Sequence, residues 1–192
     1  MIWELKTFKK MVKEAYKGSG LVVAKSGEKY IMARKWAWRM VFHESVFQKE
    51  YKAAVIEVLG DLPEAGEILL AVKGEPVQHE LEVECWLTDK RPAETFKGII
   101  VPIAVHGYQI VEGPQHMYMV DPMLLSAGGD EVKEAGEIPV SDFNIDEETQ
   151  TGYFWTNLSE YSFKLHRGQK AVDEEIIRNL EEIDWEVEDD EV

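Results

Sequence analysis

Five lysines recur through residues 5–18 at positions that one side of an α-helix would present to solvent. The apolar residues between them are spaced by three and four, which lays one continuous stripe along a helix and predicts its buried face. The stripe consists of Phe8, Met11, Val12, Ala15 and Tyr16, and the lysines are Lys6, Lys9, Lys10, Lys13 and Lys17. Lysine ammonium groups meet phosphates as mobile point charges without reading bases. The stretch therefore predicts contact with a polyanion.

The charge of the chain is divided unevenly along its length. Residues 1–60 hold twelve Lys and Arg against six Asp and Glu, whereas residues 61–192 hold nine against thirty-one, for a net charge of −16. Arg34, Lys35 and Arg39 extend the positive region beyond the first helix. Such asymmetry is typical of proteins that bind a polyanion or carry an acidic tail.

A second helix is expected over residues 46–59. Ser45 and Gln48 have the spacing of a capping box, and Gly60 with Pro63 marks the end. The apolar stripe consists of Phe47, Tyr51, Val55, Val58 and Leu62, and Lys49 and Lys52 lie off it. The candidate residues for contact with a polyanion are therefore Lys6, Lys9, Lys10, Lys13, Lys17, Lys49 and Lys52.

The sequence contains none of the common catalytic or metal-binding motifs. There is no phosphate-binding glycine loop, no CxxC and no HExxH, and the five histidines lack the spacing of metal ligands. The single cysteine, Cys85, lies in an alternating strand pattern that favours a buried apolar role. The spacing of His106, Asp121 and Ser126 gives no support to a triad. We expect a protein that is not an enzyme and has no cofactor and no metal, although a dispersed site stays open.

The composition fits a folded protein. The chain has 192 residues, of which 45% are hydrophobic, so it can bury a core. No window approaches eighteen uninterrupted apolar residues, and the first ten residues lack the apolar core of a signal peptide. We expect no membrane association and a cytoplasmic location.

Strand patterns fill much of the remaining sequence and predict an α+β fold with antiparallel sheets. Residues 30–42 suit one bent strand or two strands, and residues 67–87 read as a hairpin. Further strands are expected over residues 98–111, 116–120, 153–156 and 161–165. A helical turn capped by Asp121 is expected after residue 120. Residues 130–150 read as a loop, and a last helix is expected to begin at residue 169. We predict two N-terminal helices packed on a sheet in residues 1–87, a linker at 88–95, a smaller and mostly β domain at 96–183 with a terminal helix, and an acidic tail at 184–192.

The order of parts in residues 1–87 resembles one domain of the bacterial-type DNA sliding clamp, the ring that keeps replicative polymerases on DNA. The first strand and basic helix match MIWELKTFKKMVKEAY, and the following strands match LVVAKSGEKYIMARKWAWRMVF. The second helix and hairpin match VFQKEYKAAVIEVLGDLPEAGEILLAVKG, whose ending LGDLPEAGEILLAVKG is the closest part.

The resemblance implies helices that line the hole of a ring, with Lys and Arg directed toward double-stranded DNA, and sheets that form an acidic outer wall. It thereby implies that the DNA-binding residues are Lys6, Lys9, Lys10, Lys13, Lys17, Lys49 and Lys52. Residues 96–192 do not repeat two basic helices, so a ring would need several chains, which implies a homo-oligomer. A protein partner is also expected. The alternative is an acidic interaction or inhibitor protein, a DNA mimic that binds a nucleic-acid-binding enzyme through Glu80, Glu82, Glu84 and the carboxylates of residues 173–191.

Overall fold

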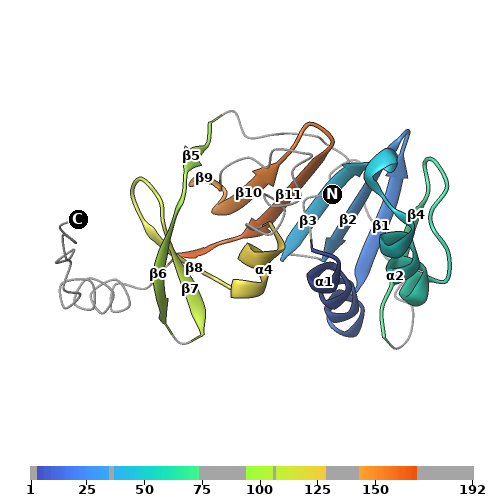
Figure 1. Ribbon diagram of the computed structural model, residues 1–192, viewed down its shortest axis with the longest axis horizontal. Coiled ribbons are helices and arrows are strands. Elements are labelled where there is room, and N and C mark those ends of the chain that lie inside the picture. Colours follow the sequence, from blue (N-terminus) through green and yellow to red (C-terminus); the bar gives the residue numbers. More distant parts are fainter. Residues whose placement is uncertain (1–3, 35–36, 74–93, 106, 129–142, 168–192) are drawn as a thin grey trace, which may run out of the picture.

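The computed structural model of the chain describes residues 4–34, 37–73, 94–105, 107–128 and 143–167. Within these ranges the fold is α+β with antiparallel sheets, as the sequence predicts (Figure 1). The helices are α1 (Leu5–Lys17), α2 (Lys49–Leu59) and α4 (Pro122–Ala127), and a 3₁₀ turn, η1 (Glu44–Val46), precedes α2.

Strands that lie far apart in the sequence share one large sheet. The strands are β1 (Leu21–Ser26), β2 (Lys29–Arg34), β3 (Trp38–His43), β4 (Ile68–Ala71), β5 (Phe96–Lys97), β6 (Ile99–Val105), β7 (Tyr108–Glu112), β8 (Met117–Val120), β9 (Asn144–Asp146), β10 (Thr151–Trp155), β11 (Ser159–Lys164) and β12 (His166–Arg167). The eight-stranded sheet has the order β4-β1-β2-β3-β11-β10-β9-β5, and the four-stranded sheet has the order β12-β8-β7-β6.

The pairing of β3 with β11 joins the two ends of the described chain. Five residue pairs connect them in antiparallel register, from Trp38 opposite Phe163 to Phe42 opposite Ser159. Strands from both sides of the predicted boundary at residues 88–95 therefore belong to one sheet. Most of that predicted linker lies outside the described residues.

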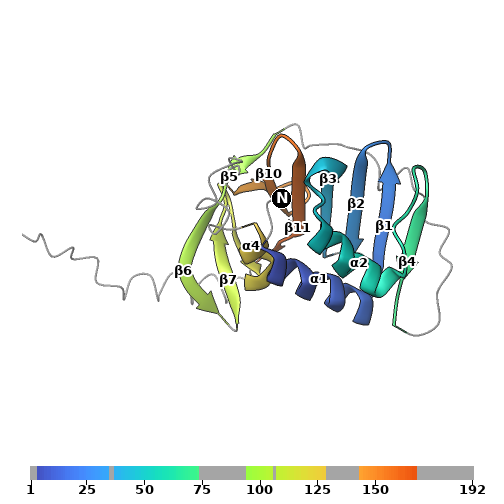
Figure 2. The same ribbon diagram turned by 45° about the vertical axis from the view of Figure 1, so that its right-hand side comes forward.

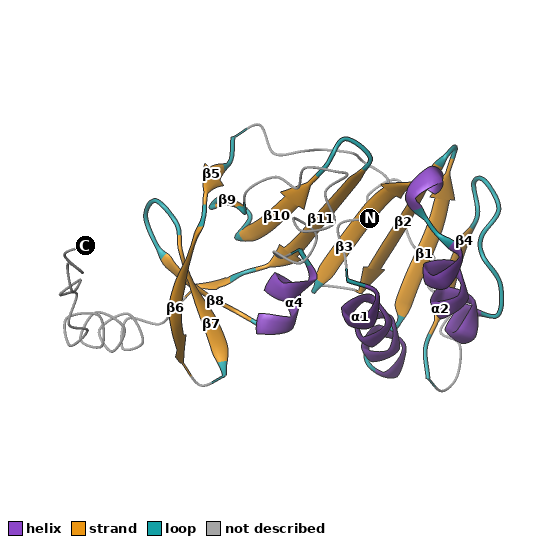
Figure 3. Cartoon of the chain, in the orientation of Figure 1, coloured by secondary structure: helices purple, strands orange, loops and turns teal. Residues whose placement is uncertain are grey.

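The helices form one layer on a single face of the eight-stranded sheet. Helices α1 and α2 lie side by side over β1 to β4, and α4 lies over β10 and β11 (Figures 1 and 2). Figure 3 shows the same division between a helical layer and a sheet. One continuous core fills the space between the layers, and its largest fully buried members include Phe8, Met11, Phe42, Tyr118, Tyr161 and Phe163.

Residue alternation gives the opposite face of this sheet a separate, smaller cluster. Ala24, Ile31 and Val41 are buried there, with Ile68 packed against them. The side chains of Arg39 and Glu160 share this face and form an ion pair with an N–O distance of 3.3 Å. The two faces of the sheet therefore differ: the one under the helices is mainly apolar, and the other contains a largely buried charge pair.

Several predicted boundaries differ from the structure. Of the two alternatives predicted for residues 30–42, the two strands, β2 and β3, are confirmed, and the single bent strand is wrong. The second helix begins at Lys49, not at residue 46, because η1 occupies residues 44–46 and Gln48 is the cap residue, without a side-chain cap. The predicted strand 98–111 is the hairpin of β6 and β7, with Gly107 in the turn at a φ of 83°. Strand β9 lies within the predicted loop 130–150.

Other predictions are confirmed, and some fall outside the described residues. Asp121 caps α4, Pro122 begins it and Gly128 ends it. Strands β10 and β11 form the predicted hairpin. The predicted strand at 77–87, which includes Cys85, the terminal helix from 169 and the acidic tail at 184–192 lie outside the described residues.

Truncation of a core side chain under α1 tests this packing. Met11 is fully buried, so the substitution Met11→Ala should lower the free energy of unfolding by about 2–5 kcal/mol through lost burial and a residual cavity. Chemical denaturation measures the change. Lys9→Ala, on the exposed side of the same helix, is the matched control and should change stability by less than about 0.5 kcal/mol. Equal effects of the two substitutions would contradict the observed orientation of α1.

Candidate nucleic-acid interface

Helix α1 is fixed at its N-terminus by the side chain of Glu4. The carboxylate accepts hydrogen bonds from the backbone N–H groups of Lys6 at 3.0 Å and Thr7 at 2.8 Å, and from the Thr7 hydroxyl at 2.9 Å. Partial burial works to raise the pKa of Glu4, but the hydrogen bonds from Thr7 and Lys6 outweigh it and hold that pKa below its ordinary value. The cap therefore works best with Glu4 ionised.

The C-terminus of α1 ends in a glycine turn beside an arginine. Gly18 donates its backbone N–H to the carbonyls of Glu14 and Ala15, and Gly20, at a φ of 101°, donates to Ala15 at 2.9 Å. A Cβ atom placed on Gly18 would lie 3.3 Å from Nη2 of Arg34, so this guanidinium lies against the last turn. The helix end carries partial negative charge, which favours a cation there. Arg34 thus extends the basic surface beyond Lys17.

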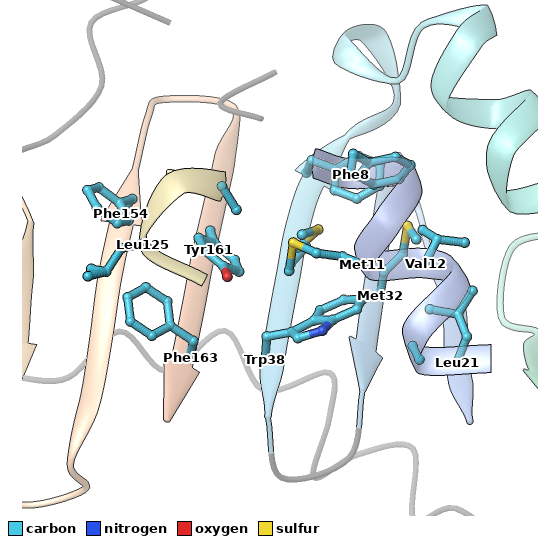
Figure 4. Packing of buried hydrophobic residues seen from close by; sticks show 14 of the residues in the cluster. Phe8, Met11, Val12, Leu21, Met32, Trp38, Leu125, Phe154, Tyr161 and Phe163 are labelled. Carbon is cyan, nitrogen blue, oxygen red and sulfur yellow. The ribbon is translucent and has the colours of Figure 1, made fainter. Parts of the chain in front are cut away.

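The buried face of α1 is the one that the sequence predicts. Phe8, Met11 and Ala15 are fully buried, Val12 is 1% exposed, and Tyr16 is half-buried. Figure 4 shows Phe8, Met11 and Val12 directed from the helix toward the sheet, near Met32 and Trp38. The lysines of α1 consequently lie on the opposite side.

All five predicted lysines of α1 are exposed, but their surroundings differ. Lys13 forms an ion pair with Glu57 of α2 at 3.0 Å, and Lys10 lies 3.9 Å from Glu14 one helical turn away. Lys6, Lys9 and Lys17 form no ion pair with any described residue. Exposed ion pairs of this kind contribute about 0–1 kcal/mol, so the paired lysines stay available to a stronger anion.

Helix α2 lies beside α1 and runs in the same direction. The rings of Phe8 and Tyr51 meet edge to face at 5.1 Å near the two N-termini, and Lys13 meets Glu57 further along. Lys49 is exposed, whereas Lys52 is half-buried and holds its ammonium 5.8 Å from the ring centre of Phe47. Glu50 and Glu57 balance these two lysines, so α2 adds no net charge to the surface of α1.

Arg39 does not belong to this surface. It lies on the opposite face of the sheet, where its guanidinium pairs with Glu160 and its side chain is 20% exposed. The expectation that Arg39 extends the positive region is therefore wrong, because strand alternation directs it away from the helices. Arg34, five residues earlier and on the face of the helices, does extend that region.

The other residues considered for chemistry have structural roles or lie outside the described residues. Asp121 accepts the backbone N–H of Met123 at 2.9 Å as the cap of α4, and the Ser126 hydroxyl donates to the Met123 carbonyl at 3.0 Å. His106 is not described. In the described part of the chain, no group of His, Cys, Asp and Glu side chains has a metal-binding arrangement.

Comparisons with known proteins give no relative for this arrangement: no family model, no curated protein and no solved structure matches the chain. Among the described residues, no helix has the length and apolar content needed to cross a membrane. The acidic residues on which the DNA-mimic alternative depends, Glu80, Glu82, Glu84 and residues 173–191, lie outside the described ranges.

Arg34 belongs to the positive region that the sequence predicts, but two contacts of the interface were not predicted. The ion pair of Lys13 with Glu57 depends on the side-by-side packing of two helices, which periodicity alone does not reveal. The placement of Arg34 against α1 could have been predicted from strand alternation. Arg34 follows the buried residues Tyr30 and Met32 by four and two positions, so its side chain lies on the same face of the strand.

Removal of the Glu4 cap should destabilise the protein in a pH-dependent way. Glu4→Ala leaves two helix N–H groups without their acceptor and should lower the free energy of unfolding by about 0.5–2 kcal/mol at pH 7. Because the folded pKa of Glu4 is lowered, its ionic contribution is present above the ordinary carboxyl pKa and is lost as the pH falls through the folded value. The difference between the variant and the original protein should therefore shrink below about pH 4.

Urea denaturation at pH 7 and pH 3 measures both effects. Glu94→Ala, an exposed carboxylate outside the helices, provides the control and should show neither loss. A difference for Glu4→Ala that is the same at both pH values would contradict an ionised cap.

Proposed function

We propose that the protein is a non-catalytic, DNA-associated accessory protein, similar to a sliding clamp, which contacts the phosphates of double-stranded DNA through α1. The observation that carries this proposal is the separation of the two sides of one helix. Its apolar stripe is buried in the core, and its five lysines are exposed along thirteen residues, with Glu14 of the same helix and Glu57 of α2 as the described carboxylates in ion-pair contact with them. The side that faces solvent is therefore a narrow cationic ridge.

The layered arrangement supports the same proposal. Helices α1 and α2 lie together on one face, and the antiparallel sheet lies behind them (Figure 2). The described order α1, β1, β2, β3, α2, β4 follows the order on which the clamp resemblance rests. In a clamp the helices are the elements that face DNA, and here α1 is the basic helix of that layer.

The net charge of −16 does not oppose this contact at short range. The described residues hold fifteen Lys and Arg against sixteen Asp and Glu, so almost the whole acidic excess belongs to the rest of the sequence. At physiological salt, charges further away than about 8–10 Å are largely screened. A phosphate that touches α1 would therefore respond mainly to the nearby lysines and to Arg34.

Encirclement of DNA would need several copies of the chain, because the described helical layer contains one basic helix. We therefore propose a homo-oligomer that acts in DNA replication in the cytoplasm, together with a protein partner. Retention on closed circular DNA, with loss from linear DNA of equal length, would support a ring. Equal retention on both forms would leave phosphate binding without encirclement.

Neutralisation of the α1 lysines tests the DNA contact directly. Replacement of Lys6, Lys9, Lys10, Lys13 and Lys17 by glutamine should abolish DNA association and leave the fold unchanged, because all five lie off the buried stripe. Binding by the unmodified protein should weaken as salt rises, with a slope of log K against log salt of up to about −4.5 for five phosphates. That slope corresponds to roughly a 500-fold loss between 50 and 200 mM salt.

Electrophoretic mobility shifts at two salt concentrations measure the binding, and circular dichroism monitors the fold. A matched pair of variants separates local charge from total charge. One replaces Lys6, Lys9 and Lys17, which form no ion pair with a described residue, and the other replaces Lys29, Lys73 and Lys97, which lie outside the helices. Only the first set should weaken binding. No DNA association at low salt, with binding to a basic protein instead, would favour the DNA-mimic alternative.

The ion pair between the helices provides a test with the opposite sign. Glu57→Gln removes the partner of Lys13 and one negative charge beside α1, so DNA binding should tighten by roughly 1.5- to 5-fold. Stability should stay within about 0.5 kcal/mol, because both side chains are about half exposed. Binding that is unchanged for Glu57→Gln and for Lys13→Gln would exclude the middle of α1 from the contact.

A further inference from the structure

The exposed side of α1 is a cationic surface without an equal anionic partner among the described residues. Only Glu14 and Glu57 lie within ion-pair distance of its lysines there. The largest anionic segment of the chain lies elsewhere: residues 168–192 hold eleven Asp and Glu against two Lys and Arg. Opposite charges of this size on one chain raise the question of whether they can meet.

The described fold brings the start of this segment close to α1. Arg167, the last described residue, pairs with Tyr118 on β8, and α4 begins four residues after Tyr118 at Pro122. Helix α4 in turn packs against α1. The path from Arg167 to α1 crosses one strand spacing of about 5 Å, then four residues of chain, then one helix-to-helix distance of about 8–10 Å. Arg167 therefore lies within roughly 30 Å of α1.

The remaining chain is long enough to cover that distance. Asp173 follows Arg167 by six residues and Glu191 by twenty-four. Twenty-four residues span about 36 Å as a helix and about 80 Å when extended, so the acidic end can reach α1 in either conformation. Its carboxylates would present the lysines with the type of charge that DNA phosphates offer.

We propose that the acidic residues 173–191 bind the lysine face of α1 in the absence of DNA and are displaced by it. The contact with the lysines stands on charge and reach alone, and its displacement by DNA rests on the proposed function. Tethering gives such a segment an effective concentration of about millimolar order, so weak ion pairs suffice to occupy the face at low salt. The segment then lowers the apparent affinity for DNA and excludes weaker polyanions.

Zero-length carbodiimide cross-linking of the full chain tests the contact without DNA. Mass spectrometry should find amide bonds from Lys6, Lys9, Lys10, Lys13 or Lys17 to carboxylates of residues 173–191. Their yield should fall at high salt and stay constant as the protein is diluted. Absence of these cross-links would overturn the proposal. A yield that falls on dilution would also overturn it, because the acidic segment of a second copy would then occupy the face.

Charge-matched variants of the full chain test the consequence for DNA. The first carries Glu188→Gln, Asp189→Asn, Asp190→Asn and Glu191→Gln, and the control carries Asp61→Asn, Glu64→Gln, Glu67→Gln and Glu94→Gln, which raise the net charge equally at exposed positions. The first variant should bind DNA at least 5-fold tighter than the control at 50 mM salt, and the two should converge at 300 mM. Equal affinities at low salt would contradict competition.

The outcomes of the cross-linking and DNA-binding measurements distinguish this inference from the proposed function. Cross-links without any DNA association would leave the intramolecular contact in place and remove the proposed function. DNA association that depends on the α1 lysines, without cross-links, would keep the proposed function and overturn this inference.

Discussion

Burial of the apolar stripe of α1 against the sheet is the constraint on which the arrangement of the charged surface depends. Phe8, Met11 and Ala15 have no exposed surface and Val12 has 1%, so the rotation of the helix about its own axis is fixed. Rotation by one residue position, about 100°, would drive a lysine ammonium into the core. An unpaired charge there costs several kcal/mol, more than any exposed ion pair returns. The direction of the lysines therefore follows from the packing of the opposite side of the helix.

The packing under α1 depends in turn on strands from the far end of the chain. The register of β3 with β11 places Met40 opposite Tyr161 and Trp38 opposite Phe163 on the face of the helices. The same register places Arg39 and Glu160 on the other face, where these residues, 121 positions apart, form a largely buried charge pair. Loss of one partner would leave an uncompensated charge, so this pair favours the observed register over a shift by one residue. The N-terminal helices thus rest on a sheet that needs both halves of the sequence.

Local periodicity predicts the elements well where one side of a helix or strand is buried, and less well where long-range contacts decide. The stripe of α1 and the Asp121 cap of α4 follow directly from residue spacing. Helix α2 begins at Lys49 and not at the predicted residue 46, because the backbone N–H of Ser45 donates to the imidazole of His43 and residues 44–46 close into a 3₁₀ turn. The pairing of β3 with β11 and the contact of Lys13 with Glu57 were not predictable, since neither leaves a pattern within one element. The spacing of the lysines alone predicts the basic side of α1, whereas the position of Arg39 outside the basic surface follows only from the pairing of strands in the sheet.

The lysine ridge has an energetic consequence for the free protein. Lys6 and Lys10, Lys9 and Lys13, and Lys13 and Lys17 are each separated by one helical turn, and like charges at this spacing destabilise a helix by about 0.2–0.5 kcal/mol per pair. Three such pairs sum to roughly 1 kcal/mol, which the burial of Phe8 alone offsets, since a fully buried aromatic side chain contributes about 1.5–3 kcal/mol. Repulsion of this size is tolerated in the fold, yet it is relieved whenever an anion lies along the ridge. A polyanion with evenly spaced charges would relieve all three pairs at once, so the proposed contact with DNA would be coupled to the stability of the helix itself.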